Sequence, residues 1–197
     1  MTFSAVESSA VERNLYAVCS LLLLTFLATV ERVRSTFRSS RDDERGKIYF
    51  RNSFFLLFSS YLTCVSSALV EFLLFKEELI LPVTLLGSFV FLAGMSLRNS
   101  AIHNLGRQWS VHIDLRKTQD IVRKGPYRYI RHPYYLAVLL ELLGFCLIAN
   151  AYYSIVVVLG AQIPLLFMRV HYEEKALIRK FGRAYLWYKR KLGSLPL

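Results

Sequence analysis

Cysteines and acidic residues are scarce in this sequence. Cys19, Cys64 and Cys146 each lie inside an apolar run, and no two of them have C-x-x-C spacing. They therefore support neither a disulfide framework nor a zinc site. The 14 acidic residues stand against 25 lysines and arginines, which gives a formal net charge of +11. A charge of this sign and size is compatible with a nucleic-acid binder and with a membrane protein.

The positions of the basic residues decide between these two classes. Hydrophobic residues make up 54% of the 197-residue chain, and the mean hydropathy is +0.36. The basic residues are confined to segments that flank apolar runs of membrane-spanning length, which is not expected of a nucleic-acid binder. The composition therefore indicates a small integral membrane protein.

Apolar runs along the chain predict the membrane crossings. Residues 1–13 place Glu7 and Glu12 against Arg13, so they lack the basic n-region of a cleavable signal peptide and we expect them to remain attached. Spans are predicted at about 14–30, 52–75, 79–97, 133–149 and 151–168. The expected fold is all-α, a polytopic integral membrane protein with about five transmembrane helices. We expect a single domain over residues 1–197, with N-terminal helices in 14–98 and the functional part in 99–197.

Charged segments between the spans predict their orientation. Residues 31–51 and 98–131 are rich in arginine and lysine, so the positive-inside rule places both in the cytoplasm. This arrangement puts the N-terminus outside and the C-terminus in the cytoplasm. Within the second segment, residues 111–115 alternate apolar and polar side chains, which is a weak signal for an extended strand.

Short connections predict two helical hairpins. A tight acidic turn joins the second and third spans, and Gly87 and Gly94 in the third span would permit close helix approach. The fourth and fifth spans meet at Asn150 with almost no loop. This second hairpin returns the chain to the cytoplasmic side.

A basic and aromatic stretch stands directly before the fourth span, and it reads Gly125-Pro-Tyr-Arg-Tyr-Ile-Arg-His-Pro-Tyr-Tyr135. Pro133 suits the first turn of a helix, so we expect a helix to begin at or just after His132. Arg128, Arg131 and a protonated His132 can pair with a carboxylate, and the tyrosines can stack on a heterocycle. The same residues would also suit a juxtamembrane belt that binds no ligand.

The second hairpin brings residues 169–175 to the membrane face from which that stretch enters. Arg169 and Glu173 are four residues apart and would share one helix face. They are candidates for a site, the alternative being a surface ion pair that contributes about 0–1 kcal/mol. Further on, Leu177, Phe181, Tyr185 and Tyr188 recur at three- or four-residue spacing between basic residues. This pattern predicts a C-terminal interfacial amphipathic helix, which could cover the site from the cytoplasm.

Taken in order, these pieces resemble a known family. The stretch 125–135, then Arg169, then Glu173-Glu174-Lys175 and Phe181-Gly182-x-x-Tyr185 are similar to the isoprenylcysteine carboxyl methyltransferase family and its phospholipid-methyltransferase relatives. The resemblance runs from about Gln119 to the C-terminus, and residues before Trp109 match only as a run of membrane spans.

The resemblance implies S-adenosylmethionine-dependent methyl transfer to a lipidic acceptor, with an active site that faces the cytoplasm. Arg169 would bind the acceptor and would form the catalytic pair with Glu173. Gln119 stands where the family typically has histidine, and the glycine motif of soluble methyltransferases is absent, as expected for a site between membrane helices. No metal is expected. Carried over position by position, the cofactor-binding residues would be Gln119, Asp120, Ile121, Val122, Tyr127, His132, Pro133, Tyr134, Tyr135 and Glu173.

Several acceptors and two other classes of protein remain open. The leading expectation is carboxyl O-methylation of an isoprenylcysteine-like acceptor, a small molecule or a prenylated peptide. A phospholipid amine or a lipidic phenol would also fit a site open to the bilayer. An NADPH-dependent membrane reductase and a non-enzymatic membrane scaffold are the other classes. The expected partners are the acceptor and membrane lipids, without nucleic acid.

Overall fold

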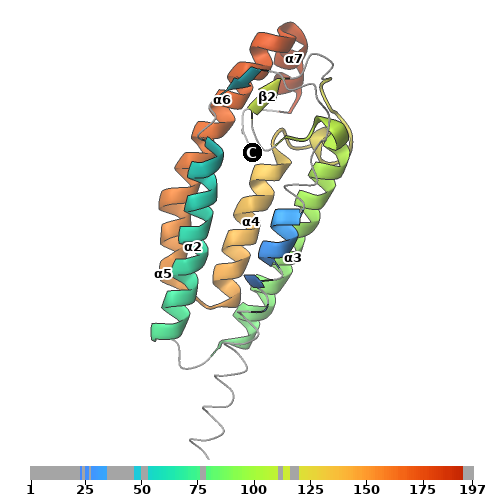
Figure 1. Ribbon diagram of the computed structural model, residues 1–197. Coiled ribbons are helices and arrows are strands. Elements are labelled where there is room, and N and C mark those ends of the chain that lie inside the picture. The colour runs from blue at the N-terminus through green and yellow to red at the C-terminus, as the bar shows by residue number, and fades with distance from the viewer. Residues whose placement is uncertain are drawn as a thin grey trace, which may run out of the picture.

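The computed structural model describes residues 23, 25, 26, 28–34, 47–49, 53–75, 79–110, 113–115 and 120–192. Most of the first predicted span and the candidate residue Gln119 lie outside these ranges. The described part is a bundle of long helices that run roughly side by side (Figure 1).

The bundle consists of α2 (Ser53–Phe75), α3 (Leu81–Leu105), α4 (Pro133–Ile148) and α6 (Ile163–Phe181). Helix α5 (Tyr152–Val157) continues through the π-helical turn η3 (Val158–Gln162) into α6. Among the described residues, three helices are long and apolar enough to cross a membrane, Phe55–Phe75, Leu81–Gln108 and Tyr152–Phe181, and α4 is a shorter apolar helix. These lengths agree with the predicted all-α membrane fold.

Short elements connect the helices at the end of the bundle where α6 finishes. They are η1 (Gly106–Gln108), η2 (Gly125–Arg128) and α7 (Arg183–Lys191). Strand β1 (Lys47–Tyr49) pairs antiparallel with β2 (Ile113–Leu115), so that Lys47 lies opposite Leu115. The extended strand predicted within residues 111–115 is therefore confirmed.

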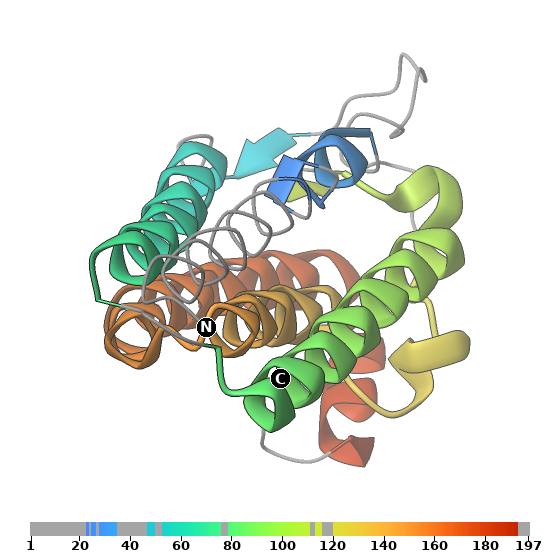
Figure 2. The same cartoon turned by 90° about the horizontal axis from the view of Figure 1, so that it is seen from below.

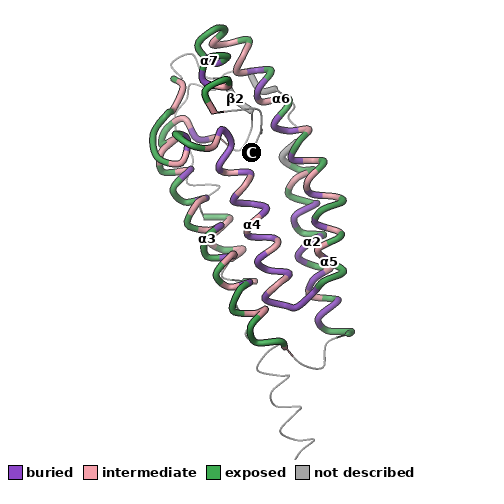
Figure 3. The backbone as a smooth tube through the Cα atoms, turned by 180° about the vertical axis from the view of Figure 1, so that it is seen from behind, coloured by how far each residue is buried: buried purple, intermediate pink, exposed green. Residues whose placement is uncertain are grey.

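Burial identifies α4 as the centre of the bundle. Figure 3 shows buried residues along α4, while α2 and α3 turn exposed faces outward. Exposed apolar side chains on those outer faces include Leu73, Phe75, Leu85 and Phe89. An apolar exterior of this kind suits contact with lipid.

Three glycines allow α3 to pack closely on α4. A Cβ atom added at Gly87 would lie 2.5 Å from the backbone nitrogen of Ile148, and one added at Gly94 would lie 2.9 Å from that of Glu141. Gly144 makes the reciprocal contact from α4, 2.5 Å from the nitrogen of Phe91. The close approach predicted from Gly87 and Gly94 is confirmed.

The predicted hairpin of the second and third spans is wrong, because α2 and α3 do not pair. Helix α2 packs against α4, α5 and η3, whereas α3 packs against α4, and Figure 2 shows α2 and α3 on opposite sides of the bundle. The start of α3 is tied to the turn between α4 and α5 instead. The Ile80 N–H donates to Asn150 Oδ1 at 3.1 Å, and Thr84 Oγ1 donates to the Ile148 carbonyl at 3.2 Å.

The hairpin of the fourth and fifth spans is confirmed. Asn150 occupies the left-handed region with φ +52° and turns the chain between α4 and α5. Glu71 of α2 anchors the other side of this turn, since its carboxylate accepts hydrogen bonds from the N–H groups of Tyr153 and Ser154 at 3.1 and 2.7 Å. It satisfies backbone donors at the start of α5, in the manner of a helix cap.

Two other expectations need correction. Residues 28–34 are helical, so Glu31 and Arg32 extend a helix rather than begin a cytoplasmic loop. Both join ion pairs inside the bundle, Arg32 with the buried Glu141 of α4 and Glu31 with the buried Arg98 of α3, since buried charges require partners of opposite sign. The C-terminal amphipathic pattern is not one helix: α6 ends at Phe181, and Gly182, with φ +55°, separates it from α7.

Candidate functional site

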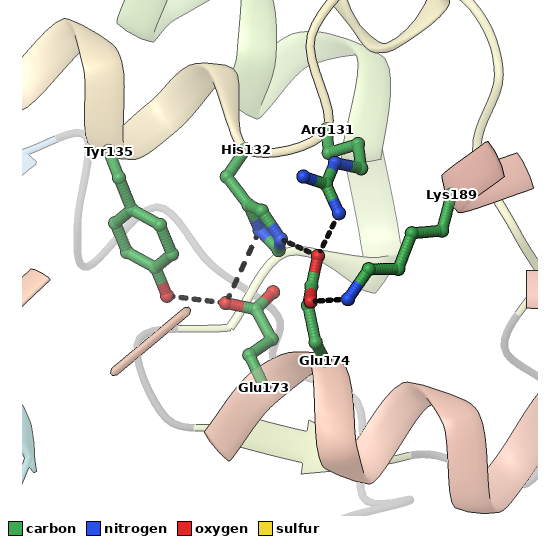
Figure 4. A network of polar contacts seen from close by, with 6 residues as sticks. All are labelled: Arg131, His132, Tyr135, Glu173, Glu174 and Lys189. Carbon is green, nitrogen blue, oxygen red and sulfur yellow. Dashed lines mark hydrogen bonds and ion pairs between the residues drawn. The ribbon is translucent and has the colours of Figure 1, made fainter. Parts of the chain in front are cut away.

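The candidate site forms where the start of α4 faces α6. Pro133 occupies the first turn of α4, as predicted, and places His132 just before the helix and Tyr135 within its first turn. Arg169 and Glu173 lie on the facing side of α6, one helical turn apart. Figure 4 shows the side chains of His132, Tyr135 and Glu173 pointing toward one another across this gap.

Tyr135 bridges Arg169 and Glu173. Arg169 Nε donates to Tyr135 Oη at 2.8 Å, and Tyr135 Oη donates to Glu173 Oε2 at 2.6 Å. Arg169 and Tyr135 are both 6% exposed, so this is not the surface ion pair that served as the alternative expectation. We call Arg169, Tyr135 and Glu173 the relay. Its hydrogen bonds to charged groups fix the orientation of both α6 side chains.

A second carboxylate, Glu174, holds the chain segments around the relay. Arg131 Nη1 and Lys189 Nζ each lie 2.5 Å from one of its oxygens, Oε1 and Oε2 respectively. Arg131 precedes α4 and Lys189 belongs to α7, so Glu174 ties both segments to α6 (Figure 4). The sequence-based list of site residues missed Glu174 and Lys189. Adjacent helical positions differ by about 100°, and both Glu173 and Glu174 can therefore face α4.

His132 lies between the two carboxylates. Its Nδ1 is 3.9 Å from Glu173 Oε2, and its Nε2 is 3.6 Å from Glu174 Oε1. The ring is stacked on Tyr135 with centroids 5.8 Å apart. His132 is 5% exposed, and within the part of the chain that the structure describes its Nε2 makes no hydrogen bond. A buried polar atom without a hydrogen bond has the capacity to form one with a ligand.

The loop before α4 closes one side of the site. Tyr127 is buried in η2, and burial together with the nearby Glu173 carboxylate raises the pKa of its phenol. Its backbone carbonyl accepts a hydrogen bond from Tyr188 Oη at 2.6 Å. The loop turns at Gly125, where φ is +56° and an added Cβ would lie 2.4 Å from the Asn104 side chain. No other residue type fits this turn without displacing Asn104.

Aromatic rings lie beside the same region. Tyr134 is half-buried and packs against Trp109 with ring centroids 4.5 Å apart. It also meets the edge of Tyr135 at 5.7 Å. Aromatic faces of this kind can stack on a heterocycle or face a cation.

The predicted site residues divide into two groups. His132, Pro133, Tyr134, Tyr135, Arg169 and Glu173 come together at the relay, with Tyr127 beside them. Asp120 is exposed, and its N–H donates to Gln108 Oε1 at 3.3 Å. Ile121 and Val122 are half-buried in the segment that leads to η2. Their proposed contact with a cofactor, like that of the undescribed Gln119, stays a prediction.

The segment that carries this site matches a known family. The model of the isoprenylcysteine carboxyl methyltransferase (ICMT) family matches residues 85–179. Over this segment, just under half of the chain, the protein is similar to the ICMT family. The matched segment contains most of α3, then η2, α4 and α5, and most of α6, and therefore every residue of the relay. The predicted resemblance is confirmed, but the match runs from residue 85 in α3 to residue 179 in α6, rather than from near Gln119 to the C-terminus.

Curated relatives carry the same ICMT-like region. Protein-S-isoprenylcysteine O-methyltransferase of Saccharomyces cerevisiae is 31% identical over 112 residues, which cover 56% of this chain and 47% of the relative. The enzyme of the same name from Schizosaccharomyces pombe is 29% identical over 107 residues, 53% of this chain and 45% of the relative. The uncharacterized protein YpbQ of Bacillus subtilis is 34% identical over 88 residues, 45% of this chain and 52% of the relative. The chain spans about half the length of the curated relatives it matches.

Proposed function

We propose that this protein is an S-adenosylmethionine-dependent methyltransferase that acts on a lipidic acceptor, with carboxyl O-methylation of an isoprenylcysteine-like substrate as its reaction. The observation that carries the proposal is the buried relay of Arg169, Tyr135 and Glu173 inside the ICMT-family segment. The apolar exterior of the bundle gives a lipidic acceptor access from the bilayer.

The residues beside the relay suit the proposed cofactor. S-adenosylmethionine presents a carboxylate, an amine, a ribose, an adenine ring and a sulfonium, and when bound it supplies the methyl group. Glu173 is engaged through Oε2 while its side chain is still 31% exposed, so it can accept a hydrogen bond from the amine or the ribose. His132 Nε2 is a buried polar atom without a hydrogen bond, and the rings of Tyr127 and Tyr134 suit the adenine and the cation.

Arg169 suits a carboxylate acceptor. Its hydrogen bond to Tyr135 Oη fixes the plane of the guanidinium, and a fixed planar guanidinium can hold a carboxylate by two parallel contacts. In the proposed reaction a carboxylate oxygen bonds to the methyl carbon, the carbon–sulfur bond breaks, and its electron pair stays on sulfur as a neutral thioether. No proton moves, so the reaction needs no general base.

The contribution of the protein is then alignment and exclusion of water. Arg169, His132 and Tyr135 are all buried, so the acceptor group and the methyl donor would meet in a site with little solvent. Effective-molarity estimates allow about 7–11 kcal/mol from positioning alone. Glu173 serves in this scheme to hold the cofactor rather than to remove a proton.

The test is product identification with purified protein in lipid nanodiscs. Protein, methyl-labelled S-adenosylmethionine and an N-acylated S-prenylcysteine are incubated, and the lipid extract is treated with mild base. A methyl ester releases its label as methanol under these conditions, whereas an N-methyl or phenol-ether product does not. The matched control acceptor is the same compound with its carboxylate converted to the amide, which should remain unlabelled.

Other outcomes separate the alternatives. Base-stable label in phospholipid or in an added lipidic phenol would replace the carboxyl acceptor while keeping methyl transfer. A rise in melting temperature with NADPH, and none with S-adenosylmethionine, would favour a reductase. No effect of either cofactor, with no labelled product, would contradict enzymatic function.

A further inference from the structure

We propose that α7 is a lid whose outer face binds anionic lipid headgroups and whose inner face closes the candidate site. The helix lies at the same end of the bundle as the start of α4 (Figure 1). Its nine residues read Arg-Ala-Tyr-Leu-Trp-Tyr-Lys-Arg-Lys and include no acidic residue. The two faces of this short helix have different contacts, and each supports one half of the proposal.

The outer face combines cations with apolar groups. Residues three, four and seven positions apart share a helix face, so Arg183, Leu186, Trp187, Arg190 and Lys191 form one surface. All five are exposed, Trp187 by 54%. Lysines and arginines beside tryptophan and leucine are typical of a helix that lies in the headgroup region.

Charge complementarity favours an anionic lipid surface as the occupant. Outside α7, the Arg123 guanidinium stands 5.1 Å above the Trp187 ring, which extends the basic surface toward η2. Basic residues near a membrane surface attract anionic headgroups, and each adds to the attraction. An acidic protein segment without apolar side chains would also match the cations, but it would leave Leu186 and Trp187 exposed to water.

The inner face of α7 reaches both segments that form the candidate site. Lys189 Nζ lies 2.5 Å from Glu174 Oε2 on α6, next to His132 (Figure 4). Tyr188 Oη donates to the Tyr127 carbonyl in η2 at 2.6 Å. Tyr185 and Tyr188 are buried on this inner face of α7. These contacts cease if α7 leaves its position, and Glu174 would then lose one of its cationic partners.

Because one rigid helix carries both faces, the two contacts are thermodynamically linked. Lipid bound at the outer face favours the position in which the inner face holds Glu174 and Tyr127, and any ligand that prefers this closed state binds more tightly. Gly182, with φ +55°, joins α7 to α6 and allows a change of direction at this point. The effect on S-adenosylmethionine affinity rests on the proposed function, whereas lipid binding by α7 does not.

Tryptophan fluorescence tests the lipid contact. The chain has two tryptophans, and Trp109 is buried, so Trp109→Phe leaves Trp187 as the reporter. Nanodiscs of this variant contain equal fractions of brominated phosphatidylserine or brominated phosphatidylcholine. We expect the anionic lipid to quench Trp187 about twice as strongly, and Arg183→Gln/Arg190→Gln in the same background to abolish the difference. As a control, Lys175→Gln/Arg179→Gln removes two exposed cations from α6 and should leave the difference in quenching between the two lipids unchanged. Equal quenching without these substitutions, or no quenching by either lipid, would overturn the proposal.

Two further readouts in the wild-type chain test the lid. Amide hydrogen exchange of residues 183–191 should be slower in discs with about 30% phosphatidylserine than in pure phosphatidylcholine. S-adenosylmethionine should bind about fivefold more tightly in the anionic discs, a coupling of ordinary size, and Arg183→Gln/Arg190→Gln should remove this gain. Equal amide exchange of residues 183–191 in the two kinds of disc would contradict the proposed lid. Absence of S-adenosylmethionine binding in every disc, with exchange still slowed by the anionic lipid, would contradict the proposed function and leave the lid intact.

Discussion

The bundle buries charge in two regions, and they differ in whether positive and negative side chains are equal in number. In the middle of the bundle, the Glu141 carboxylate of α4 accepts hydrogen bonds from Arg98 Nε at 2.6 Å and from Arg32 Nη2 at 2.7 Å. Arg98 also forms an ion pair with Glu31. We call these four residues the inner cluster. Two positive and two negative side chains are mutually paired there, and Arg98 and Glu141 are almost completely buried.

Around the relay the charges do not balance in this way. Arg131, Arg169 and Lys189 stand against Glu173 and Glu174, and we call these groups, with His132 between the two carboxylates, the open cluster. A buried nitrogen without a hydrogen bond in the described structure occurs in both regions, at His132 Nε2 and at Arg32 Nε. Ionisable residues inside a membrane protein are functional candidates by default. The comparison refines this rule, because a set with equal numbers of both charges pairs within itself, whereas a set with a surplus cation can also hold an anionic group such as a carboxylate. We therefore assign the inner cluster to stability and the relay to function.

The largest expected effect comes from breaking the inner cluster. Glu141→Gln leaves Arg32 and Arg98 with one carboxylate between them, and an uncompensated buried charge typically costs about 3–5 kcal/mol. We expect a large drop in melting temperature in nanodiscs, with S-adenosylmethionine affinity unchanged in the fraction that folds. The matched control is Arg98→Met/Glu141→Met, which removes a charge of each sign and should recover most of the stability. A Glu141→Gln protein as stable as the wild type would show that the inner cluster is not a structural tie.

The next effect concerns Arg169 and turnover. Arg169→Lys keeps the positive charge but loses the planar two-pronged donor and the Nε contact with Tyr135. A charge-assisted contact to the reacting group contributes a few kcal/mol, so turnover should fall about a hundredfold or more. The dissociation constant for S-adenosylmethionine should change little. Turnover of the identified acceptor and calorimetric titration of the cofactor are measured on the same preparation. A parallel loss of cofactor affinity would move Arg169 into the cofactor site.

A smaller effect is expected at the cofactor-binding residues. Glu173→Gln and His132→Ala each remove one charge-assisted partner at the open cluster, and such a bond contributes about 1.5–3 kcal/mol. We expect S-adenosylmethionine affinity to fall about tenfold or more while the melting temperature changes little. Calorimetric titration measures the affinity, and Glu71→Gln serves as a control that alters the cap of α5 far along the bundle. Wild-type affinity in both variants would refute the proposed cofactor site.

Sequence reasoning located the parts of this molecule that local chemistry determines. Pro133 predicted the start of α4, Asn150 predicted the turn into α5, and the small side chains at Gly87 and Gly94 predicted close packing. These outcomes depend on a residue's own backbone preference or size.

The sequence did not reveal which helices pack against each other or which distant side chains form ion pairs. The short connection between α2 and α3 suggested a hairpin, yet the glycine face of α3 packs on α4. Glu141 was read as part of an apolar span, and its partner Arg98 was read as the start of a loop. Lys189 is distant in sequence from the start of α4, so its role beside Glu174 follows only from the fold. Long-range ion pairs have no sequence period, and this is why they were missed.

The smallest expected effect tests whether Tyr135 positions the relay or merely fills space. Tyr135→Phe keeps the ring and its stacking on His132 but removes the hydroxyl that joins Arg169 to Glu173. A typical hydrogen bond contributes about 0.5–1.5 kcal/mol net, so turnover should fall about three- to tenfold. The fall should appear in turnover more than in cofactor affinity, because the guanidinium plane that faces the acceptor loses its fixed contact.

The matched control for that experiment is the neighbouring residue. Tyr134→Phe also removes one hydroxyl and keeps a ring that packs against Trp109, and it should leave turnover near the wild-type value. If both variants lose turnover equally, the effect belongs to general polarity at the start of α4 rather than to the relay. If Tyr135→Phe alone retains full turnover, Arg169 keeps its orientation through other contacts, and the open cluster would be held as firmly as the inner one.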